Sequence, residues 1–364
     1  MKIREIIQFL EQEAPPILQE SYDNCGLLTG DRDWECSGIL CCLDATEEII
    51  QEAINKKINL VVAHHPIIFR GLKKINGKNY VERTIINAIK NDIGIYAIHT
   101  SLDNVVTGVS GKMAALLGLQ NISVLSPKEN TLRKLFAFVP VDHAEKLRLA
   151  IFGAGGGDIG NYSECSFSSA GQGTFKPGEG TNPFVGKKGE RYTTDELKVE
   201  VIYPHWLEQR ILEAMRKNHP YEEVAFDIVS LDNEYSSIGS GIVGEFATSM
   251  DEEAFLKKIK SVFGTPIVRH TVLPGRPIQR VALCGGAGNF LISRALSVGA
   301  DAYVTADIKY HEFFDAEQRM LLCDIGHYES EQFTIDLLHE KMARKFPTFA
   351  VLKTAVNTNP VRYF

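Results

Sequence analysis

Leu60-Val-Val-Ala-His-His-Pro66 is the stretch of this sequence that says most about its fold. An unbroken run of four apolar residues favours a strand buried on both faces, as in a parallel sheet covered by helices. Pro66 lacks the backbone N–H that a central strand needs, so the strand should end there and leave two histidines at its carboxyl end. Ligand sites of open α/β sheets lie outside such strand ends.

The segments on either side repeat this pattern. Upstream, an apolar run over 38–43 precedes a helical pattern, and downstream another helical pattern leads into an apolar run over 95–98. The C-terminal part alternates in the same way, from an apolar run at 281–284 to a last long helical pattern over 330–345. Alternating strands and helices predict an α/β fold with a mainly parallel central sheet.

The middle of the sequence has a different pattern. From about residue 126 to residue 235, the periodicity predicts strand, helix, strand, strand, helix, strand, with a glycine-rich stretch that has room for a hairpin. This order is typical of a ferredoxin-like α+β module. Domain insertions are tolerated where chain ends lie close together. We therefore expect a split α/β domain, residues 1–125 and 236–364, interrupted by an inserted α+β domain over residues 126–235.

Composition limits the classes of function. The 46 acidic residues exceed the 39 basic ones, giving a net charge of −7 that argues against nucleic acid as a partner. No stretch approaches the ~18 to 20 apolar residues of a membrane span, and the start of the sequence lacks the apolar run of a signal peptide. We expect a cytoplasmic protein with no membrane partner. The seven cysteines form no Cys-x-x-Cys pair, which argues against a disulfide framework or a cysteine zinc finger.

Histidines follow three of the expected strands, and two of these histidines precede a carboxylate by four residues. The residues concerned are His64 and His65, His99 and Asp103, and His327 and Glu331. Because ligands bind outside the carboxyl ends of strands in α/β sheets, we expect the three segments to converge on one site. Neighbouring residues of a regular strand point to opposite faces, so the adjacent histidines would suit two ions better than one.

These residue types suit a metal. Imidazole and carboxylate groups without thiolate are ligands of Zn²⁺, Mn²⁺, Fe²⁺, Co²⁺ or Ni²⁺, and the sequence does not choose among them. The candidate ligands exceed what one tetrahedral ion requires, so we expect two divalent ions per subunit, with Asp103 and Glu331 able to bridge them. Histidines at strand ends also occur without any metal, which leaves structural coincidence as the alternative.

Four short motifs stand out in order along the chain. They are Tyr22-Asp-Asn-Cys-Gly-Leu-Leu28, Ala63-His-His-Pro-Ile67, Ile98-His-Thr-Ser-Leu-Asp103 and Asp324-Ile-Gly-His-Tyr-Glu-Ser-Glu331. They resemble the motifs of the Nif-three-like family, whose members are labelled GTP cyclohydrolase I type-two homologues or dinuclear metal-centre proteins. The resemblance implies a toroidal homohexamer whose metal pairs face its internal cavity. It also implies metal ligands at His64, His65, Asp103, His327 and Glu331, with His99 as a further ligand or a partner of the ligands.

The middle segment resembles the insert of longer family members, which is similar to the PII and CutA α+β modules. The resemblance is carried by Gly160-Asn-Tyr-Ser-Glu-Cys-Ser166, Gly171-Gln-Gly-Thr-Phe-Lys-Pro177 and His219-Pro-Tyr-Glu-Glu-Val224. One departure from the family pattern is Asn104-Val-Val-Thr-Gly108, where a proline- and glycine-rich turn is altered. It touches no proposed ligand.

Together these features favour a metal-dependent hydrolase that acts on a nucleotide or a related phosphorylated small molecule. His99 is the best candidate for a general acid or base, since imidazole titrates near neutral pH. The alternative is a non-catalytic metal-binding regulatory or scaffold hexamer that senses a metabolite or binds a protein partner. Binding of nucleic acid through the ring is a third hypothesis, against which the net charge counts.

Three further features have more than one interpretation. The glycine-rich turn Leu283-Cys-Gly-Gly-Ala-Gly-Asn289 could hold an anion on its backbone amides, but a tight turn explains it more simply. Asp23 and Asn24 could line the pocket or stabilise a turn. His219 precedes Glu222 and Glu223 and could belong to a group of metal ligands. A structural or intersubunit role is the better interpretation, because no third ligand is evident nearby.

Overall fold

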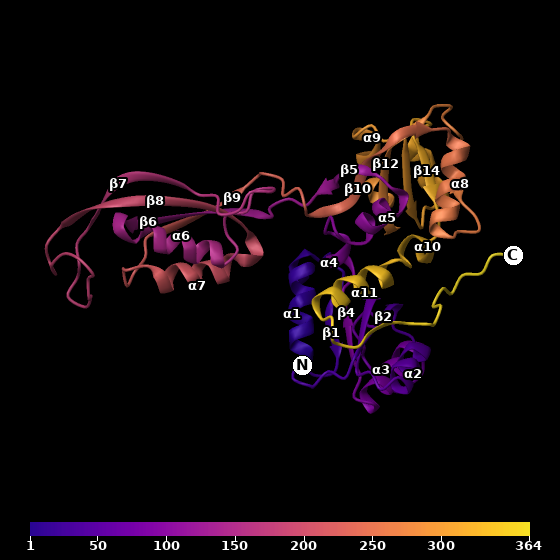
Figure 1. Cartoon of the computed structure of the whole chain (residues 1–364), viewed down its shortest axis with the longest axis horizontal. Helices are drawn as coiled ribbons and strands as arrows, with labels where there is room; N and C mark the ends of the chain where they lie inside the picture. Colours follow the sequence, from indigo (N-terminus) through magenta and orange to yellow (C-terminus); the bar gives the residue numbers. More distant parts are fainter. The chain divides into compact units, whose positions relative to one another are not determined.

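The computed structural model describes all 364 residues, Met1–Phe364 (Figure 1). Contacts within the chain divide it into two compact units, one made of Met1–Pro127 with Ser237–Phe364 and the other of Lys128–Ser236. The first unit is built on two sheets and the second on one. No helix of the protein combines the length and the apolar character that crossing a membrane requires.

The first sheet has the strand order β1-β4-β3-β2-β15. Its strands are β1 Gly26–Thr29, β2 Ile39–Asp44, β3 Leu60–His65, β4 Gly94–Ala97 and β15 Val351–Lys353. All neighbours are parallel except β1, which pairs antiparallel with β4. Helices α2 (Glu47–Asn55) and α3 (Tyr80–Lys90) pack on one face, and α11 (Thr334–Lys345) contacts β2 and β15. The central strands β2, β3 and β4 are apolar apart from Asp44, His64 and His65 at their carboxyl ends, because both faces are covered.

The second sheet has the order β11-β14-β13-β12-β10-β5. Its strands are β5 Gln120–Pro127, β10 Gly239–Met250, β11 Arg269–His270, β12 Ile278–Ala287, β13 Ala302–Ala306 and β14 Leu321–Asp324. Strands β12, β13 and β14 are parallel, and the other pairings are antiparallel. Helices α5 (Val109–Leu117) and α8 (Glu252–Phe263) cover one face, and α9 (Ile292–Ser297) covers the other.

The α/β class is confirmed, but the prediction of a single, mainly parallel central sheet is wrong. The chain builds most of one sheet, passes into a second sheet in which three of the five strand pairings are antiparallel, and returns to the first only through β15. A buried apolar run has the same pattern whichever sheet it joins, so the sequence could not separate the two. The long helix expected over 330–345 is also interrupted, because α10 (His327–Glu331) ends before α11 begins.

The third sheet belongs to the Lys128–Ser236 unit and is entirely antiparallel, with the order β7-β8-β6-β9. Its strands are β6 Leu132–Pro140, β7 Phe167–Phe175, β8 Tyr192–Pro204 and β9 Phe226–Leu231. Helices α6 (Ala144–Gly153) and α7 (Glu208–Asn218) pack against the same core, so they share one face of the sheet. The order of elements along this unit is strand, helix, strand, strand, helix, strand.

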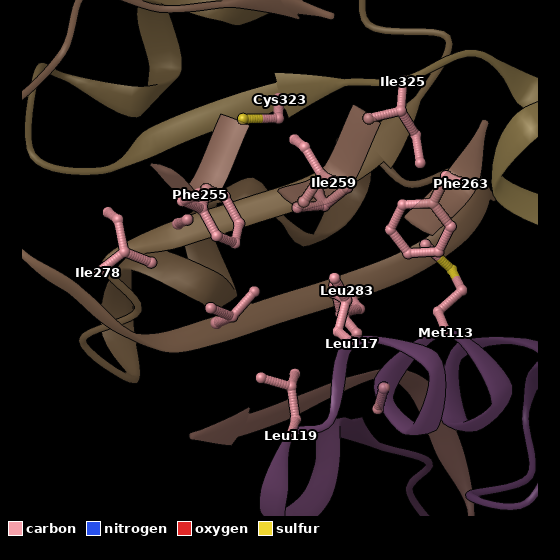
Figure 2. Close-up of a cluster of buried hydrophobic side chains, with 14 of the residues drawn as sticks. Met113, Leu117, Leu119, Phe255, Ile259, Phe263, Ile278, Leu283, Cys323 and Ile325 are labelled. Carbon is pink, nitrogen blue, oxygen red and sulfur yellow. The ribbon is translucent and has the colours of Figure 1, made fainter. Parts of the chain in front are cut away.

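Phe255 belongs to the core that α8 forms with the second sheet, together with Ile259, Leu283 and Cys323 (Figure 2). Its side chain is fully buried, and its ring meets that of Phe246 edge-on, 6.2 Å between centroids. We expect Phe255→Ala to lower the free energy of unfolding by about 3–5 kcal/mol, since it removes buried surface and leaves a cavity.

Denaturant unfolding followed by circular dichroism measures this loss. Lys257→Ala on the same helix is the matched control, because its side chain is 78% exposed and should change stability by less than about 0.5 kcal/mol. Equal effects of the two substitutions would contradict the burial of Phe255.

Candidate metal centre

The three segments that end in histidines lie together in the first unit. His64 and His65 end β3, His99 follows β4, and His327 begins α10 after β14. The ring of His65 lies 5.3 Å from that of His99 and 5.3 Å from that of His327, between centroids. The Nε2 atoms of His65 and His327 are 3.3 Å apart although 262 residues separate them in the chain. The expected convergence of strand ends is therefore observed.

The ligand atoms form two main groups that share one carboxylate. In the first, Nε2 of His64 lies 3.6 Å from Oδ1 of Asp103 and 3.8 Å from Oε1 of Glu331. In the second, Oε2 of Glu331 lies 2.9 Å from Nε2 of His65 and 3.1 Å from Nε2 of His327. Glu331 is thus common to the two groups, whereas Asp103 belongs to one group alone. His99 joins His64 and His65 in a third possible group.

Several buried polar atoms in this cluster have no hydrogen-bond partner. The side chain of His64 is fully buried, and neither of its ring nitrogens is hydrogen-bonded. Oδ1 of Asp103 is likewise buried without a hydrogen bond, whereas Oε2 of Glu331 lies within ion-pair distance of His65 and His327. A buried polar atom left in this state costs about 1–3 kcal/mol, and more when charged. A cation that accepts these lone pairs would remove the cost, so the donor set fits a divalent metal.

Three aspartates orient the other three histidines. Each carboxylate accepts a hydrogen bond from an imidazole Nδ1, which leaves Nε2 free to face a ligand. The pairs are Asp44 with His65 at 2.8 Å, Asp307 with His327 at 2.6 Å, and Asp23 with His99 at 2.8 Å. From the sequence, Asp23 was expected to line the pocket or stabilise a turn, whereas the roles of Asp44 and Asp307 were not predicted. Both could have been found, because Asp44 ends β2 and Asp307 follows β13 as the histidines follow their strands.

The charges of the cluster shift its pKa values. Burial lowers the pKa of His64 and keeps that imidazole neutral. Burial has the same effect on His65 and His327, but the nearby carboxylates outweigh it and raise their pKa values to about 10 and about 11. Burial and the charge of Glu331 raise the pKa of Asp103 to about 8. Although burial opposes ionisation of Glu331, His327 and His65 hold the pKa of that carboxyl well below its usual range. Without a cation, the cluster therefore holds protons at neutral pH.

The glycine-rich turn at the end of β12 makes room for Glu331. Gly286 has a φ of +62°, and a Cβ built on it would lie 2.3 Å from Oε1 of Glu331. The N–H of Gly286 donates to Oγ of Ser330, 2.9 Å away. Close approach to the Glu331 carboxylate is therefore a physical reason for glycine at this position.

We expect Gly286→Ala to weaken metal affinity at least about tenfold, because the new methyl group must displace the Glu331 carboxylate that the two groups share. Titration of the metal-free variant with Zn²⁺ measures the change. Gly299→Ala is the matched control, since Gly299 has a φ of +71° but nothing within 4 Å of the added Cβ. Both variants should lose about 1–2 kcal/mol of stability from the left-handed backbone, but the control should bind metal as the wild type does. Equal metal affinity in the two variants would contradict this role of Gly286.

A cavity of about 670 Å³ adjoins the cluster. His65, His99 and His327 line one side of it, and Arg269 contributes a cationic side chain. Residues 359–361 of the C-terminal segment also line the cavity. The histidines therefore border a space large enough for a nucleotide-sized ligand.

His219 lies outside this cluster, in the Lys128–Ser236 unit. Its Nε2 donates to the carbonyl of Phe138 at 2.9 Å, and its Nδ1 accepts from the N–H of Tyr221 at 3.1 Å. Both ring nitrogens are thus bonded to backbone, which fits a structural role.

The fold and the cluster define a mixed α/β protein whose histidine and carboxylate side chains could hold metal ions. The model of the Duf34/NIF3 (NGG1p interacting factor 3) family matches residues 1–360. The chain belongs to this family, and the resemblance seen in its motifs is confirmed.

Relatives of nearly equal length carry the name GTP cyclohydrolase 1 type 2 homolog. The protein of Halalkalibacterium halodurans is 41% identical over 365 residues, covering 98% of both chains. The Bacillus subtilis protein is 36% identical over 370 residues, covering 99% of this chain and 98% of its own. A solved structure described as a Bacillus cereus protein related to NIF3 has a TM-score of 0.88 at 37% identity, covering 100% of this chain and 99% of its own.

Proposed function

We propose that this protein is a metal-dependent hydrolase with two divalent ions per subunit, acting on a nucleotide or a related phosphorylated small molecule. The observation that carries the proposal is the arrangement around His64, a fully buried imidazole with no hydrogen bond that faces two carboxylates. The name of the relatives, GTP cyclohydrolase 1 type 2 homolog, supports the choice of nucleotides as first substrates to test.

The ligands of each ion follow from the two groups. One ion would be held by His64, Asp103 and Glu331, and the other by His65, His327 and Glu331. When bound, such a pair supplies a Lewis acid and an activated water at neutral pH. Zn²⁺, Fe²⁺, Mn²⁺, Co²⁺ and Ni²⁺ all accept this set of ligands.

The remaining side chains of the cavity would act on the substrate. Nδ1 of His99 is held by Asp23, so Nε2 is the nitrogen available to give or take a proton. Arg269 is paired with Asp324 at 3.0 Å, but its side chain is 53% exposed and retains N–H groups for an anion such as phosphate. We therefore assign proton transfer to His99 and anion binding to Arg269.

The test is turnover by the full-length protein loaded with each metal in turn. GTP and other nucleotides are incubated with it, and the products are separated by chromatography. His99→Asn should keep the metal content and lower turnover about 10²–10⁴-fold, since it removes only the general acid or base. If no nucleotide reacts with any metal, the non-catalytic regulatory or scaffold hexamer replaces the hydrolase as the better hypothesis.

We also propose the domain roles and the assembly. The Met1–Pro127 and Ser237–Phe364 unit would be the split metal-binding domain, and the Lys128–Ser236 unit an inserted ferredoxin-like domain of the PII and CutA kind. Support for the second comes from its antiparallel order β9-β6-β8-β7, the ferredoxin-like order of fourth, first, third and second strand. We propose that the chain assembles as a homohexamer, for which light scattering should give a mass near six times 40.5 kDa.

A further inference from the structure

A second cavity, of about 490 Å³, lies within the Lys128–Ser236 unit. Phe138 of β6 and Glu196 of β8 line it. Their neighbours along each strand pack against α6 and α7. Because successive side chains of a strand point to opposite faces, the cavity lies on the face of the sheet turned away from the two helices. The segment after β7, from Lys176 to Phe184, forms another wall.

Glu196 supplies this cavity with a buried carboxylate. The residue is only 8% exposed, and its Oε1 accepts a hydrogen bond from the hydroxyl of Tyr221 at 2.9 Å. No lysine, arginine or histidine forms an ion pair with it. On the neighbouring strand, a Cβ at Gly173 would lie 2.2 Å from Oε2, so glycine leaves the space that the carboxylate occupies. A buried carboxylate with one neutral donor lacks the positive partner that would offset its loss of hydration.

Aromatic rings surround the same space. The ring of Tyr221 lies 5.8 Å from that of Phe175 and 6.2 Å from that of Phe184, between centroids, with interplanar angles of 59° and 50°. Phe138 adds a further aromatic side chain to the lining. The faces of aromatic rings attract cations, and a cation that leaves water gains most from them.

The charges around the cavity decide which ligand suits it. Glu196, Glu222 and Glu223 contribute three carboxylates to the lining, and Lys176 contributes the one ammonium group. This excess of negative charge repels phosphates and attracts cations. We propose that this cavity binds a small organic cation, an amine or a quaternary ammonium compound. Its charged nitrogen lies against Glu196, and its carbon atoms lie against the rings of Phe175, Phe184 and Tyr221. This site is separate from the proposed metal centre and does not depend on it.

Calorimetric titration of the full-length protein tests the proposal with two probes, choline and phenethylamine. Each is paired with an uncharged compound of nearly the same shape, 3,3-dimethyl-1-butanol for choline and 2-phenylethanol for phenethylamine. We expect at least one of the two cations to bind at least about tenfold more tightly than its uncharged partner. Only the cation carries a positive charge that pairs with the buried carboxylate. GTP, the competing class of ligand, should not displace it.

Two variants place the binding at this cavity. Glu196→Gln keeps the shape of the side chain and the acceptor for Tyr221 but removes the charge. It should weaken binding of the cation at least about tenfold. Phe184→Ala removes an aromatic wall that is 51% exposed, so the fold should tolerate it, and should weaken binding about threefold or more. Glu190→Gln is the control for charge, because Glu190 is exposed and lies outside the lining of the cavity. This variant should bind the cation with wild-type affinity.

Four results would overturn the proposal. They are no binding of either amine at millimolar concentration, equal binding of amines and uncharged partners, wild-type affinity in both Glu196→Gln and Phe184→Ala, and GTP binding that displaces the amine. Metal content measured in the same samples should be unchanged in all variants, which separates this site from the metal centre.

Discussion

Glu331→Gln should abolish the uptake of both divalent ions, whereas Asp103→Asn should abolish the uptake of one. The reason is the position of Glu331, whose Oε1 belongs to the group of His64 and whose Oε2 lies 2.9 Å from His65. Asp103 belongs to the His64 group alone. Loss of partners that only orient metal ligands already costs about 10–100-fold in affinity, so loss of a charged ligand common to both ions should cost more than about 100-fold. Metal content per chain after equilibrium dialysis measures the outcome.

Glu329→Gln is the matched control for Glu331→Gln. Glu329 lies two residues earlier on α10 and is also buried, but it accepts a hydrogen bond from Asn359 at 3.1 Å and belongs to neither group of ligands. This variant should retain two ions. If Glu331→Gln bound two ions with wild-type affinity, the bridging role of Glu331 would be wrong. If Asp103→Asn lost both ions equally, the division into two groups would be wrong.

Metal binding should also release protons, and the affinity for the metal should increase steeply with rising pH. In the metal-free protein the pKa of His65 is raised to about 10 and that of His327 to about 11, so both imidazoles are protonated at neutral pH. Both must lose their protons to act as ligands. Each proton displaced makes the affinity rise up to about tenfold per pH unit. For these two protons, which belong to the ion held by His65, His327 and Glu331, the rise is up to about 100-fold per unit between neutral pH and about 10.

Calorimetry at pH 7 in two buffers with different enthalpies of ionisation measures the protons released. The observed heats should differ by the number of protons times the difference between the two enthalpies, and identical heats would contradict proton release. The free energy of unfolding of the metal-free protein should instead fall as pH rises. A raised histidine pKa stabilises the folded state, and this contribution is fully present below the ordinary pKa of about 6.5. That contribution is lost as pH rises through about 10 to 11.

The convergence of His64, His99 and His327 could be predicted because it depends on a local signal. Each follows a buried apolar strand, and ligand sites of α/β sheets lie at such strand ends. The expectation of two ions, which used strand alternation, stays a prediction: His64 and His65 belong to different groups with Glu331 but also share a third possible group with His99.

The arrangement of the sheets could not be predicted, because it depends on pairings between distant segments. Strand β15 joins β2, more than three hundred residues earlier in the chain, and β5 joins β10 across the whole middle unit. The sequence pattern of each strand carries no information about its partner. For the same reason, the sequence offered both Asp103 and Glu331 as bridges, and in the structure Glu331 belongs to two of the possible ligand groups whereas Asp103 belongs to one.

The aspartates that orient the histidines were missed for a different reason. Asp44 has no histidine within four residues, and His311, the one histidine within four residues of Asp307, belongs to none of the ligand groups. Their role depends on a hydrogen bond to an imidazole from another strand end. A search for every polar residue just past a buried strand, and not only for histidines, would have found them.

Anomalous diffraction from crystals of the protein loaded with Zn²⁺ or Mn²⁺ tests the central claim most directly. The metal centre predicts two peaks per chain about 3.5–4 Å apart. One should lie beside His64 and Asp103 and the other beside His65 and His327, with Glu331 between them. A single peak, or peaks outside the reach of these side chains, would contradict the account.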